Sequence, residues 1–252
     1  MNIMWKKINW LSLFFIVVMS ISSIAYAEVK IQKPGYTITL PDGWIEIPRY
    51  IIKESEKMLS LLAPDAPKEH YDCGFQLDTK DNWFEYPYIL IQVKELGRVP
   101  ESKLKKLRNI SSQKTVGDLN KKLEPLMSNI QFEDMNYDDE NKIIWMRHDA
   151  NVHNIGPVIG ISGMILTEKG FIQVNAYSLK KDYPAYESVF YSIVTSVIPE
   201  AELAYKPRLS DALPSGRSGA DWGKVSGKVI VGLIVGALGA IIAGIRKKKN
   251  NQ

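Results

Sequence analysis

The sequence predicts one α+β domain, an antiparallel sheet with helices packed on its faces, followed by one C-terminal transmembrane helix. Three observations predict it: strand-like alternation between turn residues recurs along residues 28–199, amphipathic helical stripes interrupt it, and both ends of the chain are apolar and basic. We expect five segments: a signal peptide (1–27), an extracytoplasmic domain (28–199), a flexible linker (200–224), a transmembrane helix (225–245) and a basic cytoplasmic tail (246–252).

The first strands are expected to form a hairpin. Residues 36–40 alternate apolar and hydroxyl side chains, which suits a strand with one buried face. Pro41, Asp42 and Gly43 then turn the chain, and residues 44–47 return as the second arm. Further strands are expected at 71–77, 88–93, 132–137, 143–146, 158–166 and 171–177, and the apolar run in 88–93 indicates a strand covered on both faces.

Three helical regions are expected between these strands. Residues 50–62 carry apolar side chains at helical spacing after Pro48. Residues 104–126 form the second region, which Pro125 should kink or stop. Residues 182–197 form the third, and its apolar stripe should lie across the sheet.

Two stretches carry a family resemblance. Residues 36–44 contain Thr-Leu-Pro-Asp-Gly-Trp, and residues 170–205 run from a Lys-Gly turn through an aromatic strand into a helix that ends at 192–197. This order resembles the PsbP-like and DcrB-like α/β/α sandwich family over most of residues 28–205. The resemblance implies an antiparallel sheet with helices on its faces, in small extracytoplasmic proteins that bind partner proteins, stabilise membrane assemblies and are not generally enzymes. It carries over no functional residue, and the C-terminal membrane helix departs from the family.

The N-terminus has the order of a secretory signal. Lys6 and Lys7 precede an apolar stretch at 10–19, and Ala25 and Ala27 form a small-x-small cleavage site. The apolar stretch is short for a bilayer span, so we expect cleavage after Ala27. An uncleaved N-terminal anchor is the alternative.

The C-terminal segment is expected to cross the membrane. Residues 229–245 carry no charge and reach about 25 Å as a helix, near the lower limit for a span. The cations that follow are Arg246, Lys247, Lys248 and Lys249. Because such charges stay on the cytoplasmic side, the domain should lie outside, in the periplasm if the cell is bacterial. A buried core helix is the alternative, although a helix that is apolar all round fits it poorly. A second alternative to a membrane helix is that the C-terminal segment is a sorting signal that is removed.

Small residues recur along this segment at helical spacing. Gly232, Gly236, Ala240 and Gly244 share one face, where the backbone of another helix can approach closely. This favours self-association or docking to another membrane protein. The alternative is the general abundance of glycine and alanine in membrane helices.

The charge distribution argues against nucleic-acid binding, and the cysteine content rules out an internal disulfide. Seven of the 32 basic residues flank the two apolar ends, so residues 28–224 hold 25 basic against 28 acidic residues, a net charge of −3. The basic character therefore belongs to membrane topology, and no nucleic-acid partner is expected. Cys73 is the single cysteine, so the fold has no internal disulfide, and its thiol is expected to be buried and inert.

Catalytic and metal-binding patterns are weak. His148, Asp149 and His153 could bring two imidazoles and a carboxylate to one strand end, but their spacing matches no metal signature. His70 and Cys73 could pair as base and nucleophile, yet residues three apart on a strand face opposite sides. No phosphate loop, nucleophile elbow or zinc-protease motif is present, so no cofactor is expected.

These observations favour a membrane-anchored, non-catalytic binding or assembly module. Its expected partners are the lipid bilayer and a membrane or extracytoplasmic protein, a second copy included. The competing hypothesis is an extracytoplasmic, hydrolase-like enzyme whose site only the fold assembles. A third is a C-terminal helix that oligomerises and perturbs membranes.

Overall fold

One large antiparallel sheet organises the molecule. The computed structural model describes residues 28–65, 68–79, 82–100, 104, 113–208, 232 and 234–241. The sheet has the strand order β3-β4-β5-β10-β9-β8-β6, and β7 also pairs with β8. Its strands are β3 (Trp44–Glu46), β4 (Cys73–Leu77), β5 (Tyr88–Lys94), β6 (Met127–Phe132), β7 (Asn136–Asp138), β8 (Ile143–Val152), β9 (Gly156–Leu166) and β10 (Phe171–Leu179).

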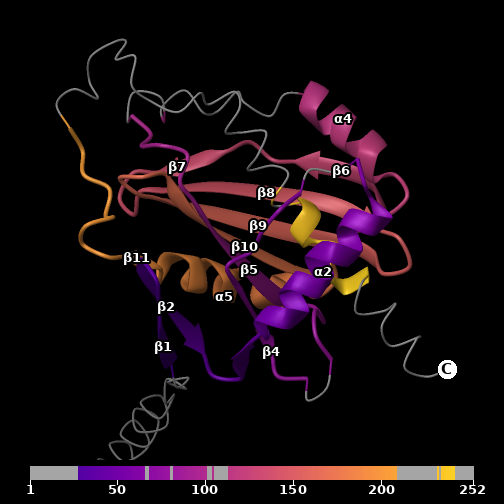
Figure 1. Ribbon diagram of the computed structural model, residues 1–252, viewed down its shortest axis with the longest axis horizontal. Coiled ribbons are helices and arrows are strands. Elements are labelled where there is room, and N and C mark those ends of the chain that lie inside the picture. Colours follow the sequence, from indigo (N-terminus) through magenta and orange to yellow (C-terminus); the bar gives the residue numbers. More distant parts are fainter. Residues whose placement is uncertain are drawn as a thin grey trace, which may run out of the picture.

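Besides the short helical turns in residues 232 and 234–241, the described residues also form a second, small sheet and the helices α2, α4 and α5 (Figure 1). The small sheet contains β1 (Glu28–Lys33), β2 (Tyr36–Pro41) and β11 (Ile198–Pro199). The helices are α2 (Arg49–Leu62), α4 (Gln113–Leu123) and α5 (Tyr183–Thr195). All strand pairs within the described residues are antiparallel, which confirms the expected α+β class.

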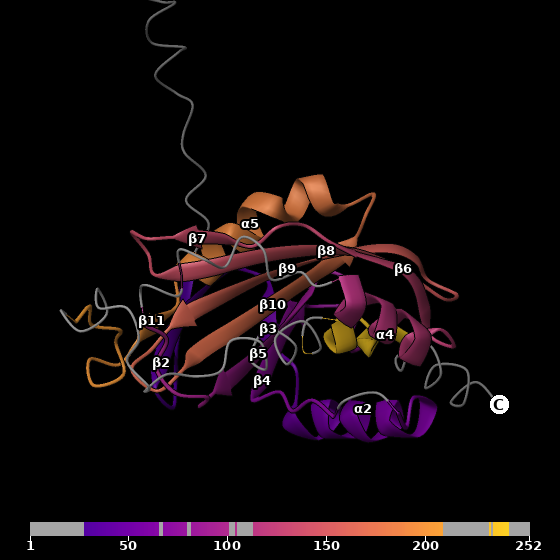
Figure 2. The same cartoon turned by 90° about the horizontal axis from the view of Figure 1, so that it is seen from above.

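The large sheet separates two layers (Figure 2). The α5 face packs against α5 and β2, and the α2 face packs against α2 and residues 234–241. Successive residues of a strand point to opposite faces, so β5 sends Ile89 and Ile91 to the α5 face and Tyr88 and Leu90 to the α2 face. The prediction that β5 is covered on both faces is confirmed.

The α5 face is a tightly packed apolar core. Phe190 of α5 is fully buried, and its ring lies 6.5 Å from the ring of Trp44 and 6.1 Å from that of Tyr186. Gly163 of β9 lets α5 approach closely, because a Cβ atom there would lie 2.2 Å from Cγ1 of Val194. Aromatic burial and close backbone approach fix α5 across the sheet, as the sequence predicts.

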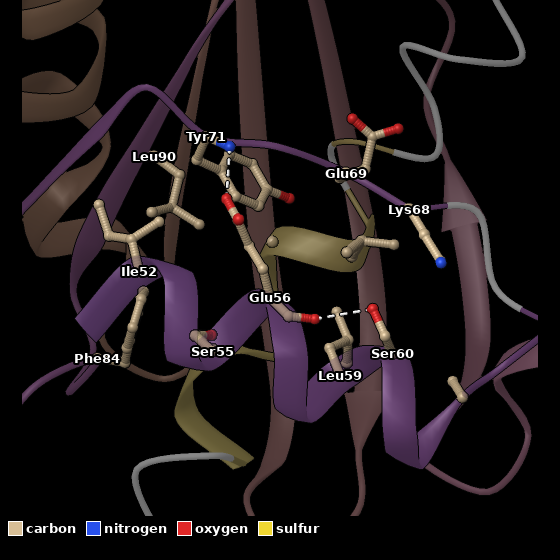
Figure 3. A pocket seen from close by; sticks show the side chains of 14 residues that line it. Ile52, Ser55, Glu56, Leu59, Ser60, Lys68, Glu69, Tyr71, Phe84 and Leu90 are labelled. Carbon is tan, nitrogen blue, oxygen red and sulfur yellow. Dashed lines mark hydrogen bonds between the residues drawn. The ribbon is translucent and has the colours of Figure 1, made fainter. Parts of the chain in front are cut away.

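Helix α2 is joined to the edge of the sheet by polar contacts. Pro48 precedes it, and Ile51 and Ile52 are buried toward the strands. Glu56 accepts a hydrogen bond of 2.8 Å from the backbone amide of Tyr71 (Figure 3), and Arg49 donates to the Tyr71 carbonyl oxygen. These contacts hold α2 over one side of the α2 face.

The expected hairpin between residues 36–40 and 44–47 is wrong. β2 pairs with β1 and β11, while β3 pairs with β4 in the large sheet. Gly43 lies at a φ of 83°, a conformation that glycine adopts without strain, and the turn there carries the chain from one sheet to the other.

Three other expected elements differ in extent. The strand expected at 143–146 continues to Val152 as β8. The strand expected at 132–137 is divided, because β6 ends at Phe132, Met135 turns into the core, and β7 begins at Asn136. The helical region expected at 104–126 contains α4, while residues 105–112 lie outside the described residues.

Residues 200–208, the start of the expected linker, are held against the domain. Tyr205 donates its hydroxyl to the Val99 carbonyl at 2.7 Å, and Glu168 accepts from the Lys206 amide at 2.9 Å. Arg98 donates to the Lys206 carbonyl at 2.7 Å. These three bonds hold residues 205 and 206 against the domain.

Several expected features lie outside the described residues: the cleavage site at Ala25 and Ala27, residues 209–231, Gly244, and the cations at 246–249. Within the described residues, no helix has both the length and the apolar character needed to cross a membrane.

Candidate binding groove

A short apolar segment lies in a groove between α2 and the sheet (Figure 2). We call residues 232 and 234–241 the tail segment; they are the described part of the expected membrane helix. Its side chains at Ile234, Val235, Ala237 and Leu238 are at most 4% exposed. Residues 232, 234–236 and 239–241 are helical, and a turn at residues 237–238 interrupts the helix. The amides of Ala237, Leu238 and Ile241 donate to the carbonyl three residues earlier around this turn.

Aromatic side chains form one wall of this groove. Phe84, Tyr86 and Tyr88 lie side by side, with ring centroids 5.5 Å apart for Phe84 and Tyr88 and 5.0 Å for Tyr86 and Tyr88. Tyr177 of β10 follows at 5.2 Å from Tyr88. With Tyr71, which precedes β4, they direct several hydroxyl groups toward the tail segment.

Four tyrosine hydroxyls donate to the backbone of the tail segment: Tyr177 donates to the Gly232 carbonyl over a long 3.5 Å, and three others make shorter bonds. Tyr71 donates to the Gly232 carbonyl at 2.7 Å, Tyr88 to the Gly236 carbonyl at 2.8 Å, and Tyr86 to the Ala237 carbonyl at 2.7 Å. All three bonds join residues far apart in the chain. Two of the acceptors, the carbonyls of Gly236 and Ala237, lie at the turn that interrupts the helix at residues 237–238.

Burial keeps these hydroxyls in the donor form. It raises the pKa of Tyr71, Tyr88 and Tyr177 well above the ordinary value for tyrosine, because a phenolate would lose its hydration. Burial likewise raises the pKa of Tyr86. The groove therefore presents neutral phenols that donate hydrogen bonds at any physiological pH.

Glycine allows the tail segment to approach this wall. A Cβ atom on Gly236 would lie 2.0 Å from the Tyr177 hydroxyl oxygen and 3.0 Å from that of Tyr71. A Cβ on Gly239 would lie 2.6 Å from the ring of Phe84. One on Gly232 would lie 2.9 Å from Oε1 of Gln92. The three glycines thus face the sheet, and a larger residue at Gly236 would collide with the groove.

Helix α2 covers the other side of the tail segment, and a small pocket remains between them (Figure 3). Its apolar wall includes Ile52, Leu59 and Leu90, and its polar rim includes Glu56 and Lys68. Val235, Gly236 and Gly239 of the tail segment close its far side. The tail segment is therefore part of the pocket wall and is not separate from the domain.

The floor of the groove is polar at Gln173, whose Oε1 would lie 3.6 Å from a Cβ atom on Gly232 and whose amide donates to Ser162 and Asn175 deeper in the sheet. Ser162 donates to Asn175 Oδ1 at 2.8 Å, and both side chains are fully buried. At the rim, Glu69 accepts from Gln92 at 3.0 Å and pairs with Lys94 at 2.6 Å. Buried polar groups disfavour folding unless they are hydrogen-bonded, so a surface of this kind is typical of a binding site.

His148 lies on the same face, buried and neutral. A Cβ on Gly160 would lie 1.9 Å from its ring, and the rings of Phe132 and Tyr177 lie 5.9 and 6.2 Å away. Within the described residues, neither ring nitrogen has a hydrogen-bond partner of standard geometry. Burial lowers the pKa of His148 to about 4, because the charged imidazolium would be desolvated.

The possible metal trio is not assembled. Asp149 lies on the opposite face of the sheet from His148, because adjacent residues of a strand point to opposite faces. Its Oδ2 lies 3.2 Å from Nζ of Lys180. His153 lies beyond the strand end, with its ring 3.2 Å from the Pro125 carbonyl. In the part of the chain that the structure describes, no three His, Cys, Asp or Glu residues are placed to hold a metal ion.

His70 and Cys73 are also apart. His70 contacts Glu56 and Arg49 of α2, with its side chain 64% exposed. Cys73 lies on the α5 face, where its sulfur is 3.3 Å from the Tyr36 hydroxyl. Burial raises the pKa of the Cys73 thiol to about 11, so the expectation of a buried thiol is confirmed.

The sequence singled out Gly232, Gly236 and Ala240 for helix packing in a membrane, which stays a prediction, and it missed the tyrosines of this groove. Gly232 and Gly236 face the groove, and Ala240 is half-buried beside it. Tyr71, Tyr88 and Tyr177 belong to three separate segments that only the fold brings together. One feature of the sequence could have indicated this face: polar side chains occur inside strands that are otherwise apolar, which suggests that the face does more than pack.

The chain has only distant similarity to solved structures. No family model matches the chain, and no curated protein matches its sequence. Among solved structures, the cyanobacterial PsbP protein CyanoP of Synechocystis sp. PCC 6803 has a TM-score of 0.41 at 12% identity, covering 71% of this chain and 96% of its own. LpqN of Mycobacterium tuberculosis, involved in cell envelope biogenesis, has a TM-score of 0.33 at 13% identity, covering 72% and 95%. A Pseudomonas aeruginosa protein of unknown function has a TM-score of 0.28 at 8% identity, covering 69% and 97%. At these identities and TM-scores the similarities carry nothing about activity or partners.

Proposed function

We propose that this protein is a membrane-tethered, extracytoplasmic binding module without catalytic activity. Its binding surface is the groove on the α2 face, and its partner is a protein that presents an apolar helical segment with small residues. The signal peptide and the C-terminal membrane helix expected from the sequence provide export and tethering.

The observation that carries the proposal is the manner in which the groove holds the tail segment. Tyr71, Tyr86 and Tyr88 bind backbone carbonyls, and glycines provide the space. Backbone carbonyls are common to all helical segments, so the same contacts suit any apolar helix that carries small residues at these positions. Small residues of this kind are frequent where membrane helices pack together.

The polar floor supports a binding role further. Ser162 and Asn175 lie buried in the middle of the sheet, where apolar side chains would stabilise the fold at least as well. The competing hydrolase hypothesis has no comparable support, because His148, Asp149 and Cys73 lie on different faces or strands of the sheet.

A direct test is binding in trans. The chain is ended after Arg208, its fold is checked by near-ultraviolet circular dichroism, and a fluorescent peptide of residues 228–249 is added. The matched control is the same peptide with Gly236→Ile, which keeps every charge. We expect saturable binding of the first peptide and binding weakened roughly 5- to 100-fold for the second, because overpacking a filled site is unfavourable by about 1–3 kcal/mol.

Two outcomes would contradict the proposal. Absence of binding by a folded, tail-less domain would remove the groove as the binding surface. Equal binding of the two peptides would show that the association is general adhesion of apolar chains and does not use the contacts described here.

A further inference from the structure

The glycine face of the tail segment has two possible uses that exclude each other. In the groove, Gly232, Gly236 and Gly239 face Gln92, Tyr177 and Phe84. In a bilayer, the same face is where another helix would pack. A single segment cannot occupy both positions at once.

The backbone carbonyls show the same exclusion. In the groove, those of Gly232, Gly236 and Ala237 accept hydrogen bonds from tyrosines. In an unbroken membrane helix, they would instead accept from amides four residues later, because lipid offers no other donor. Moving from the groove to the bilayer therefore removes the tyrosine hydrogen bonds at these three carbonyls and leaves them with partners from the helix alone.

We propose that the groove and the lipid bilayer compete for the tail segment, so that the tail segment is an exchangeable internal ligand of its own domain. When the tail segment is in the groove, the partner site is occupied. When the tail segment enters a bilayer, the groove opens beside the membrane and becomes available to a partner helix. This inference rests on the proposed function and adds the regulation of the same site.

The apolar side chains make the competition balanced. Ile234, Val235 and Leu238 are removed from water in the groove, and they would be removed from water equally in hydrocarbon. The burial of these side chains therefore favours neither state strongly. The steric fit of the glycines and the tyrosine hydrogen bonds then decide the distribution.

The test separates the two states with a pair of variants in the full chain as the host cell processes it. Gly236→Ile adds apolar volume at a position that the groove cannot accommodate and lipid can. Ala240→Ile is the matched control, because it adds apolar volume at a half-buried position of the same segment. Tyr88→Phe is a third variant that removes one donor without changing volume.

The first measurement is amide hydrogen exchange of residues 232–241 in the absence of lipid. We expect protection in the wild type and in Ala240→Ile. In Gly236→Ile we expect protection to fall roughly 5- to 100-fold, with a smaller fall in Tyr88→Phe. Unchanged near-ultraviolet circular dichroism shows that the rest of the domain remains folded.

The second measurement is flotation with vesicles of phosphatidylcholine and phosphatidylglycerol. Gly236→Ile should float more completely than Ala240→Ile, and Tyr88→Phe should lie between Gly236→Ile and the wild type. Equal flotation of Gly236→Ile and Ala240→Ile, or unchanged protection in Gly236→Ile, would overturn the inference. If the peptide of residues 228–249 still binds the tail-less domain, only the competition fails; if it does not bind, the proposed function fails first.

Discussion

The two faces of the large sheet are built on different principles. The α5 face is closed by rings and aliphatic side chains around Phe190, with helix and strand in direct contact. The α2 face carries Ser162, Asn175 and His148 among its buried residues, and part of its cover is a segment remote in sequence. We infer that the α5 face mainly supplies stability, and we propose that the α2 face holds a segment that can leave.

The strongest test of this division removes the centre of the α5 face. Phe190→Ala should lower the free energy of unfolding by about 3–5 kcal/mol, because it leaves a large cavity among rings that cannot close it. Chemical denaturation measures the change. The fraction that remains folded should bind the peptide of residues 228–249 with unchanged affinity. Loss of peptide binding in that folded fraction would show that the faces are not independent.

His148 makes the stability of the α2 face sensitive to acid. Its pKa is about 4 in the folded protein and about 6.5 when unfolded, so the unfolded chain takes up the proton first as pH falls. Stability should therefore fall between pH 6.5 and 4, by on the order of 3 kcal/mol in total from this group. His148→Gln should remove that part of the pH dependence in denaturation curves recorded from pH 7 to 4. Parallel pH profiles for the two proteins would contradict the prediction.

A smaller effect is expected for Tyr88→Phe on the α2 face. The variant leaves the Gly236 carbonyl without its donor, which should weaken binding of the peptide of residues 228–249 by about 1–2 kcal/mol, or roughly 10-fold. Fluorescence anisotropy with the tail-less domain measures it. Tyr50→Phe serves as the control, since Tyr50 is 66% exposed on α2. An unchanged affinity would mean that the hydroxyl does not take part in binding.

The smallest effect is expected for the same substitution on the other face. Tyr36 is buried on the α5 face, and among the bonds described its hydroxyl contacts only the sulfur of Cys73, which is a weak donor and a weak acceptor. Tyr36→Phe should change the free energy of unfolding by less than about 1 kcal/mol and leave peptide binding unaltered. A larger loss would place a functional hydroxyl on the face assigned to stability.

Local patterns explain which parts of the fold were predictable. Helices α2 and α5 and strands β5, β9 and β10 carry their periodicity within a few residues, and the sequence predicts each of them. The pairing of β2 with β1 rather than β3 is decided by how Gly43 directs the chain between two sheets, which periodicity does not encode. The groove depends on tyrosines from three segments, so no local pattern contains it.

The tail segment shows a deeper limit of sequence reasoning. A run of apolar residues is suited equally to hydrocarbon and to a protein interior, and the sequence left a membrane helix and a buried core helix as alternatives for residues 225–245. The described part, around Gly236, lies against the domain. Only the residues that the fold places beside the segment, Tyr177 beside Gly236 and Phe84 beside Gly239, show that a side chain at these two positions would collide with the groove.

The groove recognises Gly236 by what that residue lacks. Tyr88 donates a hydrogen bond to the backbone carbonyl oxygen, which every residue has. The Tyr177 hydroxyl lies so close to the Cα atom of Gly236 that no side chain larger than hydrogen fits. Evolution could therefore exchange Ile234 or Leu238 for other aliphatic residues with little consequence. Substitution of any of the three glycines by a larger residue would prevent the tail segment from docking. Related proteins that keep the groove should therefore keep these glycines even where the neighbouring residues differ.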